Sequence, residues 1–329
     1  RLATFLKIEA RNRKKILCTP AFPLSLPYRL ARKIKKNDLQ DPLFLQFVPL
    51  KKELELHFSS GKKTGPSEFL EKKNLQVKKK PDSLSFSPDP VCDQAFLQGR
   101  LLKKYCNRAV LLCANFCPMH CRFCFRQNLS FTPPVNFEKE IGLIRQNRRL
   151  NEIILSGGDP LALGNQELKE LLTALEKIEH VKRLRIHSRF LIGVPERLDE
   201  ELLEIFSRLQ KPLYFVLHIN HPSELDDEVK QALKKLRQRG LLLMNQSVLL
   251  KGVNDNLKTL LALSEELSNN GILFYYLHQL DRIQGAKHFE VSPSKGQKLI
   301  QGLLAKTSGY AVPKYVQEIP FQKSKTPLS

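Results

Sequence analysis

Short apolar runs rich in β-branched and aromatic residues recur along the chain from about residue 108. These runs occupy residues 109–113, 152–155, 184–187, 213–219, 241–250 and 273–279. Amphipathic stretches with helical spacing lie between them, such as 165–179, 198–209, 227–240 and 256–270. Strands that alternate with helices at about thirty-residue spacing indicate βαβ units and a parallel sheet. Six such units predict an α/β fold, an incomplete (β/α)6 barrel rather than a complete eightfold one.

The first hundred residues have weaker periodicity, several prolines and runs of basic residues. Residues 27–40 suit a helix, and residues 51–87 indicate a loop-rich wrap around the core. We therefore expect a basic, helical and loop-rich extension over 1–100, a barrel core over 101–315 and a C-terminal segment over 316–329. No repeat is visible in the sequence, which excludes a solenoid.

The composition allows a folded core. Of the 329 residues, 42% are apolar, which excludes disordered and collagen-like classes. No stretch of about 18 uncharged apolar residues is present, so no transmembrane helix is expected. The N-terminal residues carry scattered charges in place of an apolar signal region. We expect a cytoplasmic protein.

The charge is unevenly distributed along the chain. Lys and Arg number 54 against 33 Asp and Glu, a net charge of +21, and 24 basic against 10 acidic residues fall within the first 109. A basic surface can bind nucleic acid or another acidic partner, or it can simply be solvated. No zinc-finger spacing, RNP motif or KH loop accompanies the charge. A nucleic-acid partner is therefore not favoured.

Seven cysteines are present, and four of them lie within twelve residues: Cys113, Cys117, Cys121 and Cys124. An odd count without an export signal indicates metal chemistry in a reducing compartment rather than disulfides. Cys117-Pro-Met-His-Cys121-Arg-Phe-Cys124 is a CxxxCxxC motif on the loop that leaves the first predicted strand. Three thiolates are one short of the four that close an ordinary iron–sulfur site. Such a site leaves one iron open, as catalytic metals require.

A structural zinc site is the alternative interpretation of the cluster. Cys113 or His120 would then supply the fourth ligand. Zinc sites usually pair their ligands as two separate knuckles, and the sequence has no second knuckle. Cys113 is better interpreted as a buried strand residue.

The cysteine motif after the first strand of such a barrel resembles the radical S-adenosylmethionine (SAM) superfamily. Ser156-Gly157-Gly158-Asp159-Pro160 follows the second strand and is similar to the glycine motif that holds the methionine amino group of SAM in that superfamily. The resemblance implies a 4Fe–4S cluster on Cys117, Cys121 and Cys124. It also implies SAM contacts from Ser156, Gly157, Gly158, Asp159, Phe123, Arg189, His218 and Gln246.

The resemblance extends over nearly the whole chain to the lysine 2,3-aminomutase family. Blocks at 184–189, 218–221, 245–250, 284–289 and 324–328 look most like the branch that makes β-lysine for elongation factor P. The family relationship implies conversion of free L-lysine to β-lysine with a 4Fe–4S cluster, SAM and pyridoxal 5′-phosphate (PLP). It also implies an electron donor such as flavodoxin or ferredoxin, and it is compatible with a homo-oligomer.

The same resemblance assigns roles to six further residues. Lys325 would form the Schiff base with PLP, Arg108 would hold the PLP phosphate, and Tyr105 would lie beside the cofactor. Arg126 would pair with the substrate carboxylate, in preference to Arg122, which we expect to face the cluster or solvent. The substrate ε-ammonium would lie between two carboxylates, Asp281 and Glu318.

Two departures from the family pattern concern the end of the chain. The related aminomutases carry a glycine run before the PLP lysine, whereas Phe321-Gln-Lys-Ser precedes Lys325 here and predicts a stiffer loop. Glu318 replaces the Asp of the clostridial-type enzymes, which leaves the handedness of the product open.

Two other functions remain compatible with the residues. The nearer one is a radical SAM enzyme that modifies RNA or another substrate without PLP. The farther one is a basic RNA-binding protein with a structural metal.

Overall fold

One curved sheet of ten strands carries the structure. The computed structural model describes residues 1–18, 20, 22–54, 85–129, 131 and 136–329. The strands lie in chain order from β1 to β10, and all neighbours from β3 to β9 are parallel. β1 and β2 at one edge and β10 at the other edge pair antiparallel. The bounds are β1 Leu97–Gln98, β2 Leu101–Tyr105, β3 Arg108–Ala114, β4 Glu152–Gly157, β5 Arg183–Ser188, β6 Leu213–His218, β7 Leu242–Val248, β8 Leu273–His278, β9 Lys314–Gln317 and β10 Thr326–Pro327.

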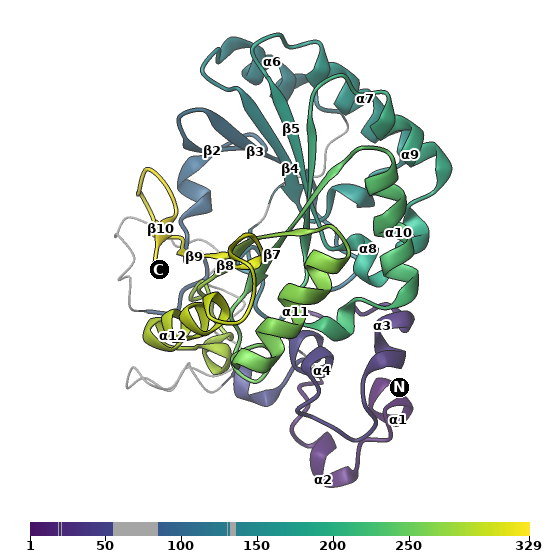
Figure 1. Ribbon diagram of the computed structural model, residues 1–329, viewed down its shortest axis with the longest axis vertical. Coiled ribbons are helices and arrows are strands. Elements are labelled where there is room, and N and C mark those ends of the chain that lie inside the picture. The colour runs from purple at the N-terminus through teal and green to yellow at the C-terminus, as the bar shows by residue number, and fades with distance from the viewer. Residues whose placement is uncertain (19, 21, 55–84, 130, 132–135) are drawn as a thin grey trace.

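Helices cover the outer face of the sheet, from α6 to α12 (Figure 1). The main ones are α6 Glu138–Gln146, α7 Asn165–Glu176, α9 Glu200–Ser207, α10 Asp227–Gln238, α11 Leu257–Asn269 and α12 Pro293–Leu304, with the short α8 Phe190–Gly193 after β5. All six predicted strands and the predicted α/β class are confirmed. The sheet is open, because β1 and β10 are not paired with each other.

Alternation along the strands separates a helix-facing side from an inner side. On β4, Ile153 and Leu155 are fully buried in the main apolar core, whereas Ile154 and Ser156 line the inner cavity. The helices follow the matching pattern of period 3.6. In α10 the Asp226 side chain caps the first turn by accepting from Val229 N, and the buried side is apolar. The inner side of the sheet is therefore the surface available for chemistry.

The N-terminal residues pack into the same apolar core as the sheet. They form four short helices, α1 Leu2–Phe5, α2 Ala10–Arg13, α3 Tyr28–Lys33 and α4 Pro42–Phe47. The predicted helix over 27–40 is wrong beyond α3, because Ile34 turns to an extended backbone and is buried. Asn37 then adopts a left-handed φ of 54° and donates its N–H to Leu6 O.

Both boundaries of the predicted three-part division fall inside the sheet. Residue 100 lies between β1 and β2, and residue 315 lies within β9. Most of the predicted loop-rich segment falls on residues 55–84, which lie outside the described residues. None of the helices in the described part of the chain is long and apolar enough to span a membrane.

We expect the Asp41→Ala substitution to destabilise the protein by about 1 kcal/mol, because Asp41 caps α4. Its Oδ1 accepts hydrogen bonds from Leu43 N and Phe44 N, and Pro42 occupies the first helical position. Urea unfolding measures the loss, with Asp41→Asn as the matched control that retains an oxygen acceptor. Equal stability of the alanine variant and the wild type would contradict this role.

Candidate active site

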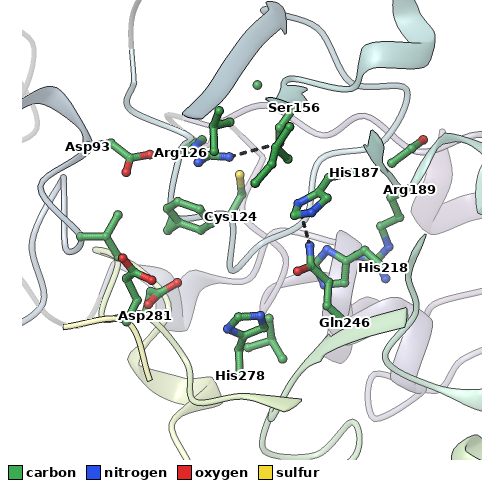
Figure 2. A pocket seen from close by; sticks show the side chains of 18 of the residues that line it. Asp93, Cys124, Arg126, Ser156, His187, Arg189, His218, Gln246, His278 and Asp281 are labelled. Atoms are coloured by element: carbon green, nitrogen blue, oxygen red, sulfur yellow. Dashed lines mark hydrogen bonds and ion pairs between the residues drawn. The ribbon is translucent and has the colours of Figure 1, made fainter. Parts of the chain in front are cut away.

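A cavity of about 490 Å³ fills the lumen inside the curved sheet. All seventeen residues to which the sequence assigned a role line it, although they come from segments spread between Tyr105 and Lys325. Figure 2 shows Cys124, Arg126 and Ser156 around this space together with His187, His218, Gln246 and His278. Ligands bound by these residues would share one enclosed space.

The loop with the three cysteines leaves β3 at its carboxyl end and is fastened to the N-terminal residues. His120 N donates to Ser25 O at 2.9 Å, and Ser25 Oγ donates to Pro118 O at 3.0 Å. Arg122 was expected to face the cluster or solvent, and this expectation is wrong. Its guanidinium is buried and pairs with Glu53, with Nε 3.0 Å from Oε1. Arg122 therefore anchors the loop to the N-terminal segment.

Cys117, Cys121 and Cys124 line the cavity, whereas Cys113 does not. Cys113 is fully buried in β3, and burial raises the pKa of its thiol to about 12. Burial likewise raises the pKa of Cys124 to about 11. His120 contacts Pro23 O through Nδ1 at 2.8 Å and stacks on Phe22. Neither candidate for a fourth zinc ligand thus belongs to the cavity wall.

The donor set fits a multi-iron cluster better than a single ion. In the described ranges, no three His, Cys, Asp or Glu side chains converge as one metal ion requires. A four-iron cluster binds each thiolate at a different iron, so its ligands are spaced more widely. Three cysteines also leave an open position facing the cavity, which suits a catalytic metal centre.

The glycine motif after β4 packs its backbone against the cysteine loop. Gly158 N donates to Ala114 O, and Asp159 N donates to Phe116 O at 2.9 Å. A Cβ atom at Gly158 would overlap the backbone of Phe116, and Gly157 has a φ of 114°. The glycines are therefore required for a close backbone approach. Their predicted contact with SAM stays a prediction.

Asp159 is engaged on both carboxylate oxygens within the protein. Oδ1 accepts from Ser188 Oγ at 2.8 Å, and Oδ2 accepts from Arg189 N at 2.8 Å. Burial raises the pKa of Asp159 to about 6. The carboxylate thus joins the motif to the end of β5.

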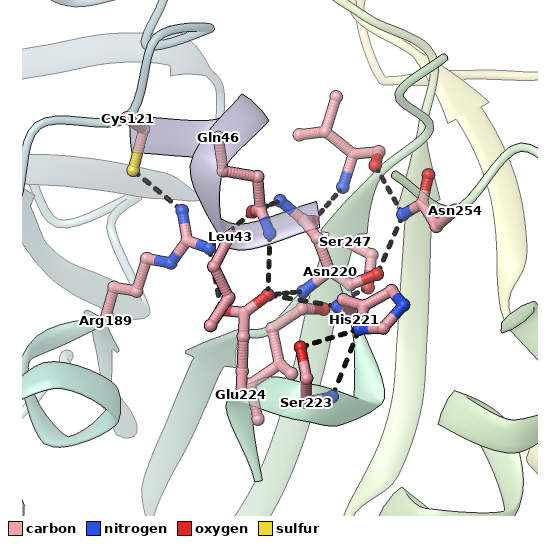
Figure 3. A network of polar contacts seen from close by, with 12 residues as sticks. Leu43, Gln46, Cys121, Arg189, Asn220, His221, Ser223, Glu224, Ser247 and Asn254 are labelled. Atoms are coloured by element: carbon pink, nitrogen blue, oxygen red, sulfur yellow. Dashed lines mark hydrogen bonds and ion pairs between the residues drawn. The ribbon is translucent and has the colours of Figure 1, made fainter. Parts of the chain in front are cut away.

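Arg189 lies at the centre of a buried polar network (Figure 3). Its Nη2 donates to Glu224 at 2.7 Å and to Gln46 at 2.6 Å, and its Nη1 lies 2.8 Å from Cys121 Sγ. Glu224 also accepts from the backbone of Asn220 and His221. The predicted SAM contact of Arg189 is untested, but the residue supports the cluster loop directly.

Two buried histidines offer polar atoms to a ligand. His187 Nε2 and His218 Nε2 have no hydrogen-bond partner in the described part of the chain, and both side chains line the cavity. Gln246 Nε2 lies 3.4 Å from His187 Nδ1. Burial lowers the pKa of both histidines well below the usual value, so both are neutral. Unpartnered buried polar atoms fit a site that a ligand with hydroxyl or amino groups completes.

Lys325 enters the cavity because β10 pairs with β9. Thr326 lies opposite Gln317, which sets Lys325 across from Glu318. Lys325 Nζ is 2.8 Å from Glu318 Oε2, and Tyr105 OH donates to the same carboxylate at 3.0 Å. The Arg108 guanidinium lies 4.1 Å from the Tyr105 ring centre. A reactive lysine and a cation suited to phosphate thus lie along one wall, and both fit PLP.

The loop between β9 and β10 contains the departure noted in the sequence. Phe321 adopts a φ of 64°, a left-handed conformation that glycine takes at lower cost. Its ring packs against Phe96 at 5.4 Å between centroids. The aromatic contact therefore holds a strained loop where related enzymes have glycines.

A chain of ion pairs connects the two ends proposed for the substrate. Arg126 Nε is 2.8 Å from Asp93 Oδ2, and Lys104 Nζ is 2.6 Å from Asp93 Oδ1. Lys104 Nζ lies 3.7 Å from Glu318 Oε1. Burial raises the pKa of Asp93, but Arg126 and Lys104 outweigh it and hold that pKa below its usual value.

Asp281 differs from the other acids in the lumen. Its carboxylate has no hydrogen bond or ion pair among the described residues, and burial raises its pKa to about 7. The positive charge of Lys325 opposes this rise without forming an ion pair. An acid without a partner in a cavity is suited to receive a cationic group from a ligand.

Sequence reasoning missed several residues of the cavity wall: Asp93, Lys104, Glu152, Arg185, His187, Tyr275, Tyr276 and His278. Strand alternation could have found some of them. Arg185 and His187 are four and two residues before Arg189, so all three share one side of β5 and its end. Asp93 and Lys104 lie in no motif that the sequence analysis recognised.

We expect Asp281→Asn to stabilise the ligand-free protein by up to about 4 kcal/mol at pH 8, because each pKa unit corresponds to about 1.4 kcal/mol. The folded-state pKa of about 7 lies above the ordinary value of 3.8. The wild type therefore loses stability as the pH rises from about 4 through 7. Urea unfolding should show that the free energy of unfolding of the variant exceeds that of the wild type by an amount that grows with pH across this range. The difference should level off above pH 7. An advantage independent of pH would contradict the assignment.

Comparison with known proteins places the chain in a family. Residues 111–263 match the Radical SAM superfamily. An L-lysine 2,3-aminomutase of Escherichia coli K12 is 39% identical over 325 residues, which cover 98% of this chain and 86% of that protein. The protein of the same description from Buchnera aphidicola is 36% identical over 97% of this chain and 88% of its own length. The one from Haemophilus influenzae is 37% identical over 93% and 84%.

Among solved structures, a radical SAM methyltransferase from Sphaerobacter thermophilus aligns with a TM-score of 0.47 and 19% identity, over 66% of this chain and 68% of that one. This likeness is too low to add to the assignment. The relatives matched over nearly their whole length decide it. The chain belongs to the L-lysine 2,3-aminomutase family within the radical SAM superfamily.

Proposed function

We propose that the protein is a lysine 2,3-aminomutase, an isomerase that moves the α-amino group of L-lysine to C3. The observation that carries this proposal is the content of one cavity. It is lined by three cysteines, by Lys325 paired to a carboxylate, by Arg126 among other arginines, and by Asp281, which has no ion-pair partner among the described residues. Free lysine presents a carboxylate and an ammonium at its two ends, which match this set of charges.

The cofactors of the family supply the bond-breaking chemistry. When bound, the 4Fe–4S cluster with SAM supplies a hydrogen-abstracting radical, and PLP supplies the carrier for the migrating amino group. Cys117, Cys121 and Cys124 would hold the cluster, and Lys325 and Arg108 would hold PLP. His218 and Gln246 line the same cavity, and the His218 ring lies 5.8 Å from the Phe123 ring of the cysteine loop, so both residues could contact SAM.

The side chains of the lumen position the substrate and keep water away. Arg126 would bind the carboxylate, for which its planar guanidinium is suited. Asp281 and Glu318 would receive the ε-ammonium, whose burial without partners costs several kcal/mol. Enclosure by the sheet protects reactive species from solvent. Tyr105, which donates to Glu318, fixes the orientation of that carboxylate.

The partners and cellular role proposed here follow from the family and from the sequence blocks already described. The reaction needs an electron donor for the cluster, and we propose flavodoxin or ferredoxin. We further propose a cytoplasmic location and the supply of β-lysine for elongation factor P. The blocks at 184–189, 218–221 and 284–289 support this branch.

Anaerobic reconstitution tests the proposed reaction. Protein loaded with iron, sulfide and PLP should convert lysine to β-lysine in the presence of SAM and a reductant, as measured by mass spectrometry. We expect Lys325→Ala to lose product formation and the PLP absorbance while it retains iron. The reason is that Lys325 directly precedes β10, whereas the cysteines lie on the loop after β3. Undiminished β-lysine formation by this variant would refute the PLP assignment.

Cysteine variants provide the matched control for the cluster. Cys117→Ala should lose iron and all SAM cleavage, whereas Cys113→Ala, which alters a thiol outside the cavity, should keep both. Iron with SAM cleavage but no PLP binding in the wild type would point to an RNA-modifying enzyme. Zinc in place of iron and sulfide would point to a structural metal.

Charge at the far end of the substrate gives a further prediction. Asp281→Asn should weaken the use of lysine by roughly two to three orders of magnitude, as expected from about 3–5 kcal/mol for a broken buried charge pair. PLP and iron contents should not change. Asp281 is a cleaner test than Glu318, because Glu318 also contacts Lys325.

Norleucine, which lacks the ε-ammonium, is the control substrate for this variant. The Asp281→Asn enzyme should lose much less activity with norleucine than with lysine, relative to wild type. Equal losses with both substrates, or wild-type kcat/KM for lysine, would show that Asp281 does not bind the ammonium.

A further inference from the structure

Arginines gather around a single carboxylate at the end of the lumen where the strands begin. Arg108 on β3 lies opposite Glu152 on β4, and Glu152 lies opposite Arg183 on β5. Arg185 follows two residues later on the same side of β5. The side chains of Arg185 and Glu152 are only 11% and 8% exposed. The Arg185–Glu152 ion pair is therefore almost removed from water.

The charges in this group do not cancel. Glu152 accepts from Arg185 through Nε at 2.8 Å and also through Nη2. It accepts from Arg183 Nη2 at 3.3 Å. Arg108 donates to Asn107 Oδ1 and stacks on Tyr105, and it has no carboxylate partner in the part of the chain that the structure describes. Arg183 and Arg185 thus share Glu152, while Arg108 has no carboxylate of its own among the described residues, so Arg108, Arg185 and Glu152 together carry one positive charge in excess.

The excess charge faces the cavity. Arg108, Arg185 and Glu152 line it, whereas Arg183 does not. Burial raises the pKa of the Tyr276 hydroxyl, and both Arg108 and Arg185 act to lower it. The two guanidinium groups therefore lie around the same ring. A cavity wall with one guanidinium that lacks a carboxylate favours an anionic ligand.

We propose that Arg185, oriented by Glu152, is the second guanidinium of the phosphate site and clamps the phosphate of PLP together with Arg108. A phosphate monoester carries about −1.5 to −2 charge at neutral pH and would be attracted by both guanidinium groups. Arg108 is connected to Lys325 through Tyr105 and Glu318. A ligand held at Lys325 could thus reach Arg108 along one wall. This inference rests on the proposed function, because it presumes that PLP binds.

Equilibrium binding of PLP, followed by absorbance and without turnover, tests the role of Arg185. Arg185→Gln should weaken PLP binding roughly ten- to hundredfold, the usual loss for hydrogen bonds to a charged group. Pyridoxal, which has no phosphate, should bind wild type and variant equally. The PLP affinity of Arg185→Lys should lie between those of wild type and Arg185→Gln, because lysine keeps the positive charge but cannot donate two parallel hydrogen bonds as a guanidinium does.

Arg183→Gln is the matched control, since it removes a cation from the same carboxylate outside the cavity. Its side chain is 36% exposed, so solvent screens its charge, and PLP affinity should stay within about threefold of wild type. Inorganic phosphate should compete with PLP in wild type and lose this effect in Arg185→Gln. Iron content and thermal unfolding confirm that each variant is folded.

Four outcomes separate the role of Arg185 from the proposed function. Unchanged PLP affinity in Arg185→Gln overturns the role of Arg185 alone. Equal weakening of PLP and pyridoxal also overturns it, because Arg185 would then support the lumen and not the phosphate. If Arg185→Gln does not fold, an unchanged ratio of PLP to pyridoxal affinity in Arg185→Lys overturns it. Wild-type protein that binds no PLP refutes the proposed function itself.

Discussion

The buried ion pair between Arg189 and Glu224 is the interaction on which the active site depends. Both groups are almost fully excluded from water, so each needs every hydrogen bond that it makes. Their partners come from four separate parts of the chain: Gln46 at the end of α4, Cys121 in the cluster loop, Asp159 after β4, and the backbone after β6. Removal of one partner of such a pair typically costs about 3–5 kcal/mol. The pair therefore holds the loop with the three cysteines and α4 in fixed positions against the sheet.

The charged side chains of the lumen are arranged so that ligands exchange partners with the protein. Arg126, Asp93, Lys104, Glu318 and Lys325 form a continuous series of alternating sign. A bound carboxylate would compete with Asp93 for Arg126, and an ammonium would compete with Lys325 for Glu318. Ion pairs within the protein stabilise the cavity when no ligand is bound. The free energy gained on binding is therefore only the difference between the ion pairs made with the ligand and those given up within the protein. Asp281 has no ion-pair partner among the residues that the structure describes, so its ionisation gains the most from a cationic ligand.

The sequence predicted the parallel strands and the cysteine and glycine motifs because both leave local signals. Strands buried on both faces produce apolar runs, and the motif residues sit at fixed spacings. It did not predict contacts made by residues far apart. Arg122 lies between two cysteines, yet its partner Glu53 is 69 residues away. Asp93 is 33 residues from Arg126, and nothing near it in the sequence indicates an ion pair. The sequence analysis also did not predict α4. This helix could have been predicted, because Asp41-Pro42 is a local signal for the start of a helix.

Strand direction separates the cysteine and glycine motifs from the proposed phosphate site. The cysteine loop and the glycine motif lie at the carboxyl ends of β3 and β4, whereas Arg108 and Glu152 lie at the amino ends of the same strands. Six or seven residues at about 3.3 Å each place the two ends roughly 20 Å apart. Lys325 lies in the cavity between these two ends of the strands, because the two-residue β10 that follows it pairs with β9. Pairing of Pro327 with Val316, and of Leu328 N with Tyr315 O, fixes the register that sets Lys325 beside Glu318. A shift of one residue would turn Lys325 to the other face, so this short strand determines where the reactive amine lies.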